Sequence, residues 1–212
     1  MNGREYLTLA GKGESRYEEK KSVFLGFAGT FETEADVLGW LSSLKRAYPD
    51  ARHHVYAYRL RNDNTARYSD DREPQGTAGM PTLDVLRQKD LVDCAVCVIR
   101  YFGGTLLGTG GLVHAYGTAA ADAVKAAGIV RMEERRAFSL VLSYADHPRV
   151  QSILAERGAV VTDVAYAEGV TVSGSIAQKD TDALARALSD ATAGRIVPEW
   201  GGILFSPVPV EN

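Results

Sequence analysis

The sequence predicts an α+β protein of two domains, residues 1–132 and 133–212. The chain has 212 residues, of which 45% are hydrophobic, and this suits two small domains that each bury a core. Strand-like alternation and helix-like apolar stripes take turns along the chain. A charged segment at residues 130–136 (VRMEERR) interrupts two apolar patterns, so we place the domain boundary there.

The first half begins with an apolar alternation at residues 22–31, which predicts a strand. Residues 33–48 follow as a helix, with Thr33 as the N-cap and Asp36 in a capping-box position. Residues 53–61 form the next strand, and because neither of its faces is purely apolar, we expect an edge strand or a functional surface. The remaining elements predicted in this half are a helix at 80–89, a buried strand at 91–102, a glycine-rich loop at 103–111 and a helix at 112–127.

The second half has the element order βαββαβ, which is typical of a split βαβ, ferredoxin-like unit. Its predicted elements are strand 137–144, helix 146–157, strands 159–167 and 169–177, helix 181–192, and strand 195–205, interrupted by Gly201 and Gly202. Nothing in this half indicates catalysis. His147 stands beside Pro148 at a helix start and is expected to be solvated.

Charge and hydropathy exclude several classes of protein. The net charge is −3, so any contact with nucleic acid must come from a local cationic patch. No apolar run reaches the roughly 18 residues of a membrane span, and the N-terminal segment is polar and contains acids, unlike a signal peptide. We therefore expect a cytoplasmic protein without a membrane partner.

The two cysteines, Cys94 and Cys97, form a C-x-x-C pattern inside the predicted buried strand. Residues i and i+3 of a strand point to opposite faces and lie about 10 Å apart, whereas a disulfide needs Cα atoms within about 7 Å. We expect two buried thiols with no redox or zinc role.

Five glycines, Gly103, Gly104, Gly108, Gly110 and Gly111, precede the helix at 112–127. They could turn backbone N–H groups toward an anion at the helix N-terminus. The segment lacks the third glycine of a dinucleotide fingerprint and the lysine of a P-loop. A tight crossover that lets strand and helix pack closely explains the glycines equally well.

Asp70, Asp71 and Glu73 form a carboxylate cluster that could perform acid–base chemistry or hold Mg²⁺. The alternative, which we favour, is a solvated turn whose acids cap the next helix and pair with arginines. A metal site that combines His53 or His54 with His114 and an aspartate is the weaker possibility, and we predict no metal and no cofactor. No G-x-S-x-G elbow occurs, so nucleophilic catalysis is not supported.

Arginines and tyrosines are interleaved in the segment before this cluster, at Arg52, Arg59, Arg61, Arg67 and Arg72 and at Tyr56, Tyr58 and Tyr68. Cations follow phosphates and aromatic rings stack on bases, so this pattern favours nucleic-acid binding. An ordinary strand pair with charged outer positions is the alternative.

Two segments, DDREPQGTAGMP at 70–81 and RYFGG at 100–104, resemble the signature blocks of the IMPACT/YigZ family. The histidine pair before an alternating strand also fits. The signature residues are His53, His54, Asp70, Asp71, Glu73, Pro74, Gly76, Thr77, Ala78, Gly79, Pro81, Tyr101 and Phe102. Two positions depart from the family pattern: Arg72 stands where glycine is common, and His114 where arginine is common.

The resemblance implies an N-terminal βαβ domain similar to a small-subunit ribosomal protein and to domain IV of elongation factor G. It implies a C-terminal ferredoxin-like domain similar to domain V of that factor. Domains of this kind contact RNA or the ribosome. Eukaryotic members control translation initiation through a kinase activator and an additional protein-binding domain, and we do not transfer that mechanism.

The preferred hypothesis is a non-enzymatic, translation-associated regulator that binds RNA or the ribosome, without DNA specificity. Phosphate contacts are predicted from Arg59, Arg61, Arg67 and Arg100, with His114 and the five glycines shaping an anion site. One alternative is an enzyme that acts on a phosphorylated small molecule or nucleotide through the glycine-rich loop. A second alternative is a protein–protein interaction module that uses Tyr101 and Phe102.

Overall fold

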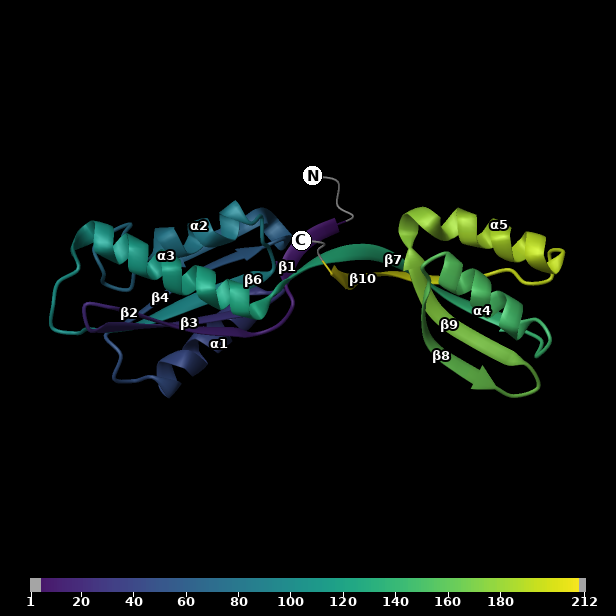
Figure 1. Ribbon diagram of the computed structural model, residues 1–212, viewed down its shortest axis with the longest axis horizontal. Helices are drawn as coiled ribbons and strands as arrows, with labels where there is room; N and C mark the ends of the chain where they lie inside the picture. The colour runs from purple at the N-terminus through teal and green to yellow at the C-terminus, as the bar shows by residue number, and fades with distance from the viewer. Residues whose placement is uncertain (1–4, 210–212) are drawn as a thin grey trace. The chain divides into compact units, whose positions relative to one another are not determined.

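The structure, a computed structural model, describes residues 5–209 and has an α+β architecture. Clustering of contacts divides the chain into two compact units, Tyr6–Arg131 and Met132–Pro207, which we call the N-terminal and the C-terminal unit. Figure 1 shows each unit as a sheet with helices packed on it. In the described part of the chain, no helix is both long and apolar enough to cross a membrane.

The N-terminal unit is built on a five-stranded sheet in the order β2–β3–β6–β4–β5, in which every neighbouring pair is antiparallel. Its strands are β2 (Gly13–Glu19), β3 (Ser22–Thr30), β4 (His53–Leu60), β5 (Thr65–Ser69) and β6 (Cys94–Tyr101), and its helices are α1 (Glu34–Ala47), α2 (Gly79–Gln88) and α3 (Gly108–Ala127). A 3₁₀ turn (Asn62–Asn64) joins β4 to β5, and β1 (Glu5–Leu9) precedes the sheet.

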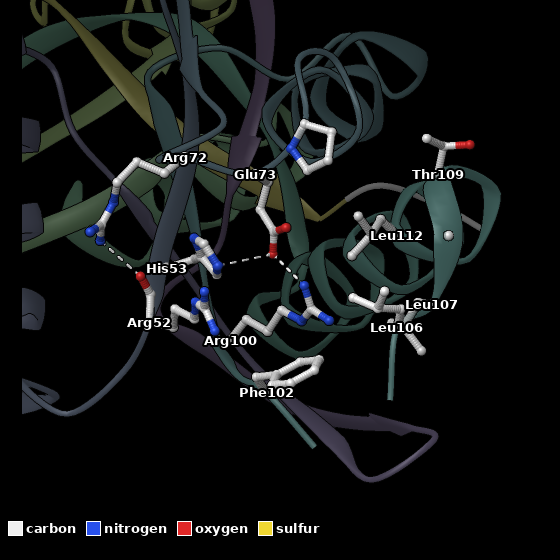
Figure 2. A pocket seen from close by; sticks show the side chains of 12 residues that line it. Arg52, His53, Arg72, Glu73, Arg100, Phe102, Leu106, Leu107, Thr109 and Leu112 are labelled. Atoms are coloured by element: carbon white, nitrogen blue, oxygen red, sulfur yellow. Dashed lines mark hydrogen bonds and ion pairs between the residues drawn. The ribbon is translucent and has the colours of Figure 1, made fainter. Parts of the chain in front are cut away.

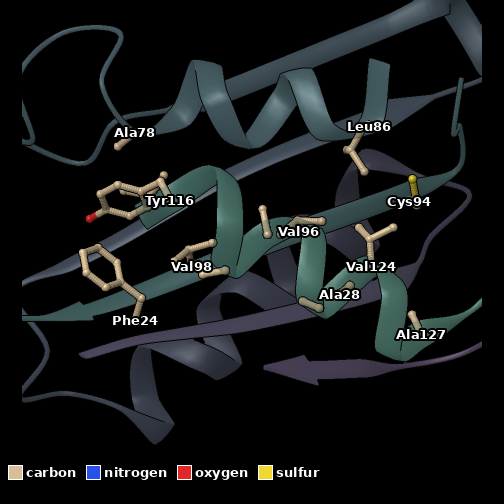
Figure 3. Close-up of a cluster of buried hydrophobic side chains, with 14 of the residues drawn as sticks. Phe24, Ala28, Ala78, Leu86, Cys94, Val96, Val98, Tyr116, Val124 and Ala127 are labelled. Carbon is tan, nitrogen blue, oxygen red and sulfur yellow. The ribbon is translucent and has the colours of Figure 1, made fainter. Parts of the chain in front are cut away.

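The two faces of this sheet carry separate apolar cores. Helices α2 and α3 cover one face, where Phe24, Val96 and Tyr116 are buried (Figure 3). Helix α1 covers the other face and buries Leu41 and Ile99 there. The predicted cap of α1 is confirmed, because the Asp36 backbone N–H donates to the Thr33 hydroxyl at 3.2 Å.

Helix α3 packs unusually close to β2 and β3 because glycines face it. A Cβ added at Gly13 would lie 2.1 Å from the carbonyl oxygen of Ala123, and one added at Gly26 would lie 2.5 Å from that of Ala119. The alanines of α3 thus meet glycine backbone across the interface. This close approach fixes the middle and the C-terminal end of α3 against β2 and β3.

The C-terminal unit has the predicted βαββαβ order. Its elements are β7 (Ile129–Leu142), α4 (His147–Glu156), β8 (Val160–Tyr166), β9 (Val170–Ala177), a 3₁₀ turn (Gln178–Asp180), α5 (Thr181–Thr192) and β10 (Glu199–Pro209). Its sheet runs β7–β9–β8, with neighbouring strands antiparallel, and β10 also pairs with β7. Its core lies between the sheet and helices α4 and α5 and contains Leu140, Leu154 and Leu184.

Several sequence predictions are corrected by the structure. Strand β4 is not an edge strand, since it lies between β6 and β5. Helix α3 begins at Gly108, four residues before the predicted start, so the last predicted loop glycines belong to its first turn. Strands β1, β2 and β5 were not predicted. Strand β10 passes Gly201 and Gly202 without interruption.

The charged segment at 130–136 is not a break between strands, as it forms part of β7. Arg135 is buried there, and its guanidinium donates to the Ser175 hydroxyl and to the carbonyl oxygens of Ser175 and Gly158. The division between the two units falls inside β7, between Arg131 and Met132.

Candidate functional site

A cleft of about 340 Å³ opens at one end of the sheet in the N-terminal unit. Antiparallel pairing places the start of β4 opposite the end of β6, with His53 in register with Arg100. The acidic turn after β5 and the segment leading into α3 close the remaining sides (Figure 2). The lining residues are Arg52, His53, Arg72, Glu73, Pro74, Arg100, Phe102, Leu106, Leu107, Gly108, Thr109 and Leu112.

The acidic turn is held by Asp70, whose carboxylate accepts three backbone N–H groups. These come from Gly76 at 2.9 Å, Ala78 at 3.1 Å and Gly79 at 2.8 Å, so Asp70 satisfies the N-terminus of α2 from outside the helix. The favoured interpretation of the cluster as helix-capping acids is therefore correct for Asp70. Its carboxylate is occupied by this structural role.

Asp71 and Arg72 shape the turn through their backbone. Their φ angles are +40° and +72°, in the left-handed region that favours glycine. A glycine at the position of Arg72 would adopt this conformation without strain. The Asp71 carboxylate accepts the backbone N–H of His54 at 2.7 Å, which fixes the turn to the start of β4.

A buried ionic cluster forms the back of the cleft. One guanidinium nitrogen of Arg100 (Nη1) donates to Oε1 of Glu73 at 2.6 Å, and the hydroxyl of Tyr116 donates to the same oxygen at 2.8 Å. The side chains of Glu73 and Arg100 are only 5% and 6% exposed. Burial, reinforced by the Glu73 charge, raises the pKa of Tyr116, which keeps this phenol a proton donor.

His53 completes the cluster from the β4 side. Its Nδ1 lies 2.8 Å from the carbonyl oxygen of Asp71, so this nitrogen carries a proton and donates. Its Nε2 faces Oε1 of Glu73 at 3.6 Å (Figure 2). Glu73 thus accepts from Arg100 and Tyr116, and its charge is neutralised by Arg100.

The mouth of the cleft is cationic on one side and apolar on the other. Arg72 donates to the backbone carbonyl of Arg52 at 2.8 Å. The guanidinium of Arg52 lies 5.8 Å from the centre of the Phe102 ring, which is 40% exposed. Leu106, 83% exposed, extends the apolar side. The cleft therefore offers two exposed arginines next to a ring that is available for stacking.

Of the four arginines predicted to bind phosphate, only Arg100 lines the cleft. Arg59 is in register with Cys94 at the opposite end of the strand pair, about 20 Å away at 3.3 Å per residue. Its guanidinium contacts Asp90 and the carbonyl of Leu91, and that of Arg61 pairs with Asp93 at 3.3 Å. Arg67 is exposed on the edge strand β5.

The predicted glycines have different roles. Gly103 is pressed against β3, since a Cβ there would lie 2.1 Å from the backbone carbon of Lys21, and its N–H donates to the Ser22 hydroxyl. Gly104 and Gly108 have φ angles of +85° and +73°, with open space where a Cβ would be. Gly110 and Gly111 lie in the first turn of α3.

The remaining predicted residues lie outside the cleft. His114 and Pro81 line a separate hollow between α2 and α3, and His114 contacts the Tyr17 ring edge-on. Tyr101 packs against the α1-side core, so it does not share a surface with Phe102. His54 is buried, and burial lowers its pKa. Gly76, Thr77 and Ala78 belong to the turn that leads into α2, and Gly79 is the first residue of that helix.

No group of three or more His, Cys, Asp or Glu side chains in the described residues could hold a metal ion. The conceivable site combining His114 with His53 or His54 and an aspartate is therefore wrong. Cys94 and Cys97 are free and buried in different cores, on opposite faces of the sheet, as predicted.

Sequence reasoning did not single out Arg52, Arg72, Tyr116 and Thr109 as site residues. Arg52 and Arg72 stood within the arginine run, and Tyr116 stood in the apolar stripe of its helix. Their convergence depends on strand register and on where α3 begins. Neither the register nor the start of the helix can be predicted from the hydrophobic pattern along the chain.

Comparisons with known proteins agree with this picture. The family model of the Impact N-terminal domain matches residues 20–124, and a domain of unknown function (DUF1949) matches residues 140–195. The chain is 30% identical over 191 residues to IMPACT family member YvyE of Bacillus subtilis, covering 90% of this chain and 88% of that protein. It is 32% identical to IMPACT family member YigZ of Escherichia coli, over 66% and 70% of the two chains.

Among solved structures, a crystal structure described as that of a hypothetical protein matches with a TM-score of 0.60 and 27% identity. The match covers 92% of this chain and 96% of the other. The identity to the curated relatives extends across both units, and the signature blocks at 70–81 and 100–104 build the walls of one cleft. The chain belongs to the IMPACT family.

Proposed function

We propose that this protein is a translation-associated regulator that binds RNA, and that the cleft of the N-terminal unit holds the RNA. One observation carries the proposal: two exposed arginines, Arg52 and Arg72, line a nucleotide-sized cleft together with the exposed ring of Phe102. The link to translation rests on the resemblance of both domains to ribosome-contacting domains.

Electrostatics favours this place on the molecule. The net charge is −3, so binding of a polyanion needs a locally cationic surface. Inside the cleft the only carboxylate in the lining, Glu73, is neutralised by Arg100. Arg52 is exposed, and Arg72 is 75% exposed with a 3.8 Å contact to Asp71, so both can turn toward a phosphate. Arg59 and Arg61 contact acids at 3.3 Å at the other end of β4.

The aromatic contribution comes from Phe102. Base stacking on an exposed ring tolerates any sequence and contributes about 1–3 kcal/mol per base. The guanidinium groups of Arg52 and Arg100 lie 5.8 and 5.6 Å from the centre of the Phe102 ring, which is 40% exposed. This arrangement supports binding of a single strand with little sequence preference.

The test is the affinity for a short single-stranded RNA, measured by fluorescence anisotropy over a series of salt concentrations. Two or three phosphate contacts predict a slope of log affinity against log salt of about −1.4 to −2.1, at about −0.7 per contact. The double variant Arg52→Glu/Arg72→Glu should lose most of the affinity for all sequences alike. The control Arg16→Glu/Arg87→Glu makes the same charge change at exposed positions outside the cleft and should retain more affinity. No binding at low salt would exclude the proposal.

The second candidate function is an enzyme that acts on a phosphorylated small molecule. The observation that favours it is the buried cluster of His53, Glu73 and Tyr116, because ionisable groups that converge at the back of a cleft are common in active sites. Incubation of the protein with nucleoside mono- and triphosphates, followed by chromatography, separates the two functions. Product formation that a His53→Ala substitution abolishes would favour the enzyme.

A further inference from the structure

The N-terminus of α3 opens into the same cleft, where Gly108 and Thr109 are lining residues. No side chain among the described residues caps this helix at its N-cap position, Leu107. Gly108 has a φ angle of +73° and open space at its Cβ position, so no side chain covers the backbone there. The first N–H groups of a helix have no partners within the helix, and its dipole favours an anion.

Arg100 supplies a second, independent indication of an anionic ligand. The residue is 5% exposed, and its Nη1 and Nη2 contact Glu73 and Ser22. Its Nε–H is enclosed and finds no hydrogen-bond partner among the described residues. A buried donor without an acceptor costs about 1–3 kcal/mol. Arg100 lines the cleft, so a ligand oxygen that draws its guanidinium outward would give this N–H an acceptor.

These donors come from four segments that line one cleft. Arg52 and Arg72 contribute from the start of β4 and the acidic turn, Arg100 from the end of β6, and the backbone N–H groups from α3 (Figure 2). We propose that the cleft recognises the terminal phosphate monoester of a nucleotide, either at the end of an RNA strand or free. This inference rests on the proposed function and narrows it to a chain end.

Charge distinguishes a terminal monoester from an internal diester. A phosphate monoester carries about −1.5 to −2 charges at pH 7 and three acceptor oxygens, whereas an internal phosphate of RNA carries one negative charge. A site with two exposed arginines, a helix N-terminus and the Arg100 guanidinium offers donors to all three oxygens.

Size and shape point to a single nucleotide. The cleft volume of about 340 Å³ is at the lower end of small-molecule pockets, which span roughly 300–1,000 Å³. Its back is closed by Glu73 and Arg100. Phe102 and Leu106 form an apolar rim on which the base can lie. The phosphate then sits inside and the rest of the strand leaves toward solvent.

Titration calorimetry at low salt with ten-nucleotide single-stranded RNAs tests the inference. Strands with a terminal phosphate at either end should bind about tenfold or more tightly than the same strand with hydroxyl ends. Adenosine monophosphate should compete, and adenosine should not. Equal affinity for all strands overturns the inference and leaves RNA binding intact. If adenosine monophosphate binds but none of the RNA strands does, the phosphate site is supported and the proposed function is contradicted. If no probe binds, both the site and the proposed function are contradicted.

A substitution at the start of α3 separates recognition from folding. Thr109→Glu places a carboxylate at an exposed position in the first turn of α3, where the helix dipole stabilises a negative charge. The temperature of thermal unfolding should therefore stay the same or rise. That carboxylate should repel the ligand phosphate and remove the preference for phosphorylated strands. Thr109→Gln has nearly the same size without the charge and should keep it. A Thr109→Glu protein that retains the full preference would contradict the site.

Discussion

At the scale of single residues, the acidic turn shows how three neighbouring carboxylates are given different roles by the backbone. Asp70 accepts backbone N–H groups that lead into α2, Asp71 fixes the start of β4, and Glu73 is buried against Arg100. The sequence shows only three acids in a polar turn. Their separation into structural and cleft-lining groups depends on the left-handed backbone at Asp71 and Arg72.

Asp70→Ala should destabilise the N-terminal unit by about 2–4 kcal/mol, because an ionised acceptor of three backbone N–H groups is lost. The measurement is urea unfolding followed by circular dichroism. As a control, Asp84→Ala on the exposed surface of α2 should change the free energy of unfolding by less than about 0.5 kcal/mol. Equal effects of the two substitutions would show that Asp70 does not hold the turn.

The two thiols give a prediction about pH. Burial raises the pKa of Cys94 and of Cys97 to about 12, from an ordinary value of 9.0. The folded state thus favours the protonated thiols. Their contribution to the free energy of unfolding is complete below pH 9.0 and is lost as the pH rises toward about 12.

At pH 8, iodoacetamide should leave both thiols of the folded protein unmodified and alkylate both in urea, as read by mass spectrometry. Urea unfolding should show a Cys97→Ala variant losing less stability than the parent between pH 9 and 11. Rapid alkylation of the folded protein would contradict the burial of these side chains.

At the scale of elements, the sequence predicts those whose signals are local. Thr33 and the apolar stripe behind it mark α1, and the alternation of Val23, Leu25 and Phe27 marks β3. Strand β2 escapes prediction because its inward side chains are small or polar, Gly13 and Ser15 among them, and its outward ones are charged. The start of α3 is missed because glycine is a poor helix former.

The packing of α3 on the sheet provides a prediction at this scale. Gly26→Ala would bring a methyl group within 2.5 Å of the Ala119 carbonyl oxygen, and β3 is paired on both sides and cannot move aside easily. We expect a loss of about 1–3 kcal/mol or more. Gly39→Ala, at an exposed position of α1 with open space around it, should instead stabilise the protein by about 0.5–1 kcal/mol. Thermal unfolding of both variants decides; tolerance of Gly26→Ala would show that α3 is not closely packed.

At the scale of the whole molecule, the fold class and the family follow from the sequence, while the site follows only in part. The signature blocks identify the acidic turn and the end of β6, which do line the cleft. The sequence alone does not show which arginines line the cleft, because Arg52 and Arg59 lie on the same short segment and reach opposite ends of the sheet. Long-range register decides which of them can meet a ligand.

The two units have separate apolar cores. We propose that they fold as two domains that divide near residue 132, as the sequence predicts. The cationic cleft belongs to the N-terminal unit alone, so RNA binding should need no residue that follows α3 in the chain. The role of the C-terminal unit in that binding is a separate question for the intact chain.

The claim that this cleft binds phosphate is tested most directly by nuclear magnetic resonance of the intact, ¹⁵N-labelled protein during titration with adenosine monophosphate. We predict that the Nε–H signal of Arg100 and the backbone amides of Thr109 and Gly110 shift in a saturable manner, while the Nε–H signal of Arg59 stays in place. Shifts that gather instead around Arg59, Arg61 and Arg67, or an unchanged Arg100 signal at millimolar nucleotide, would contradict the account.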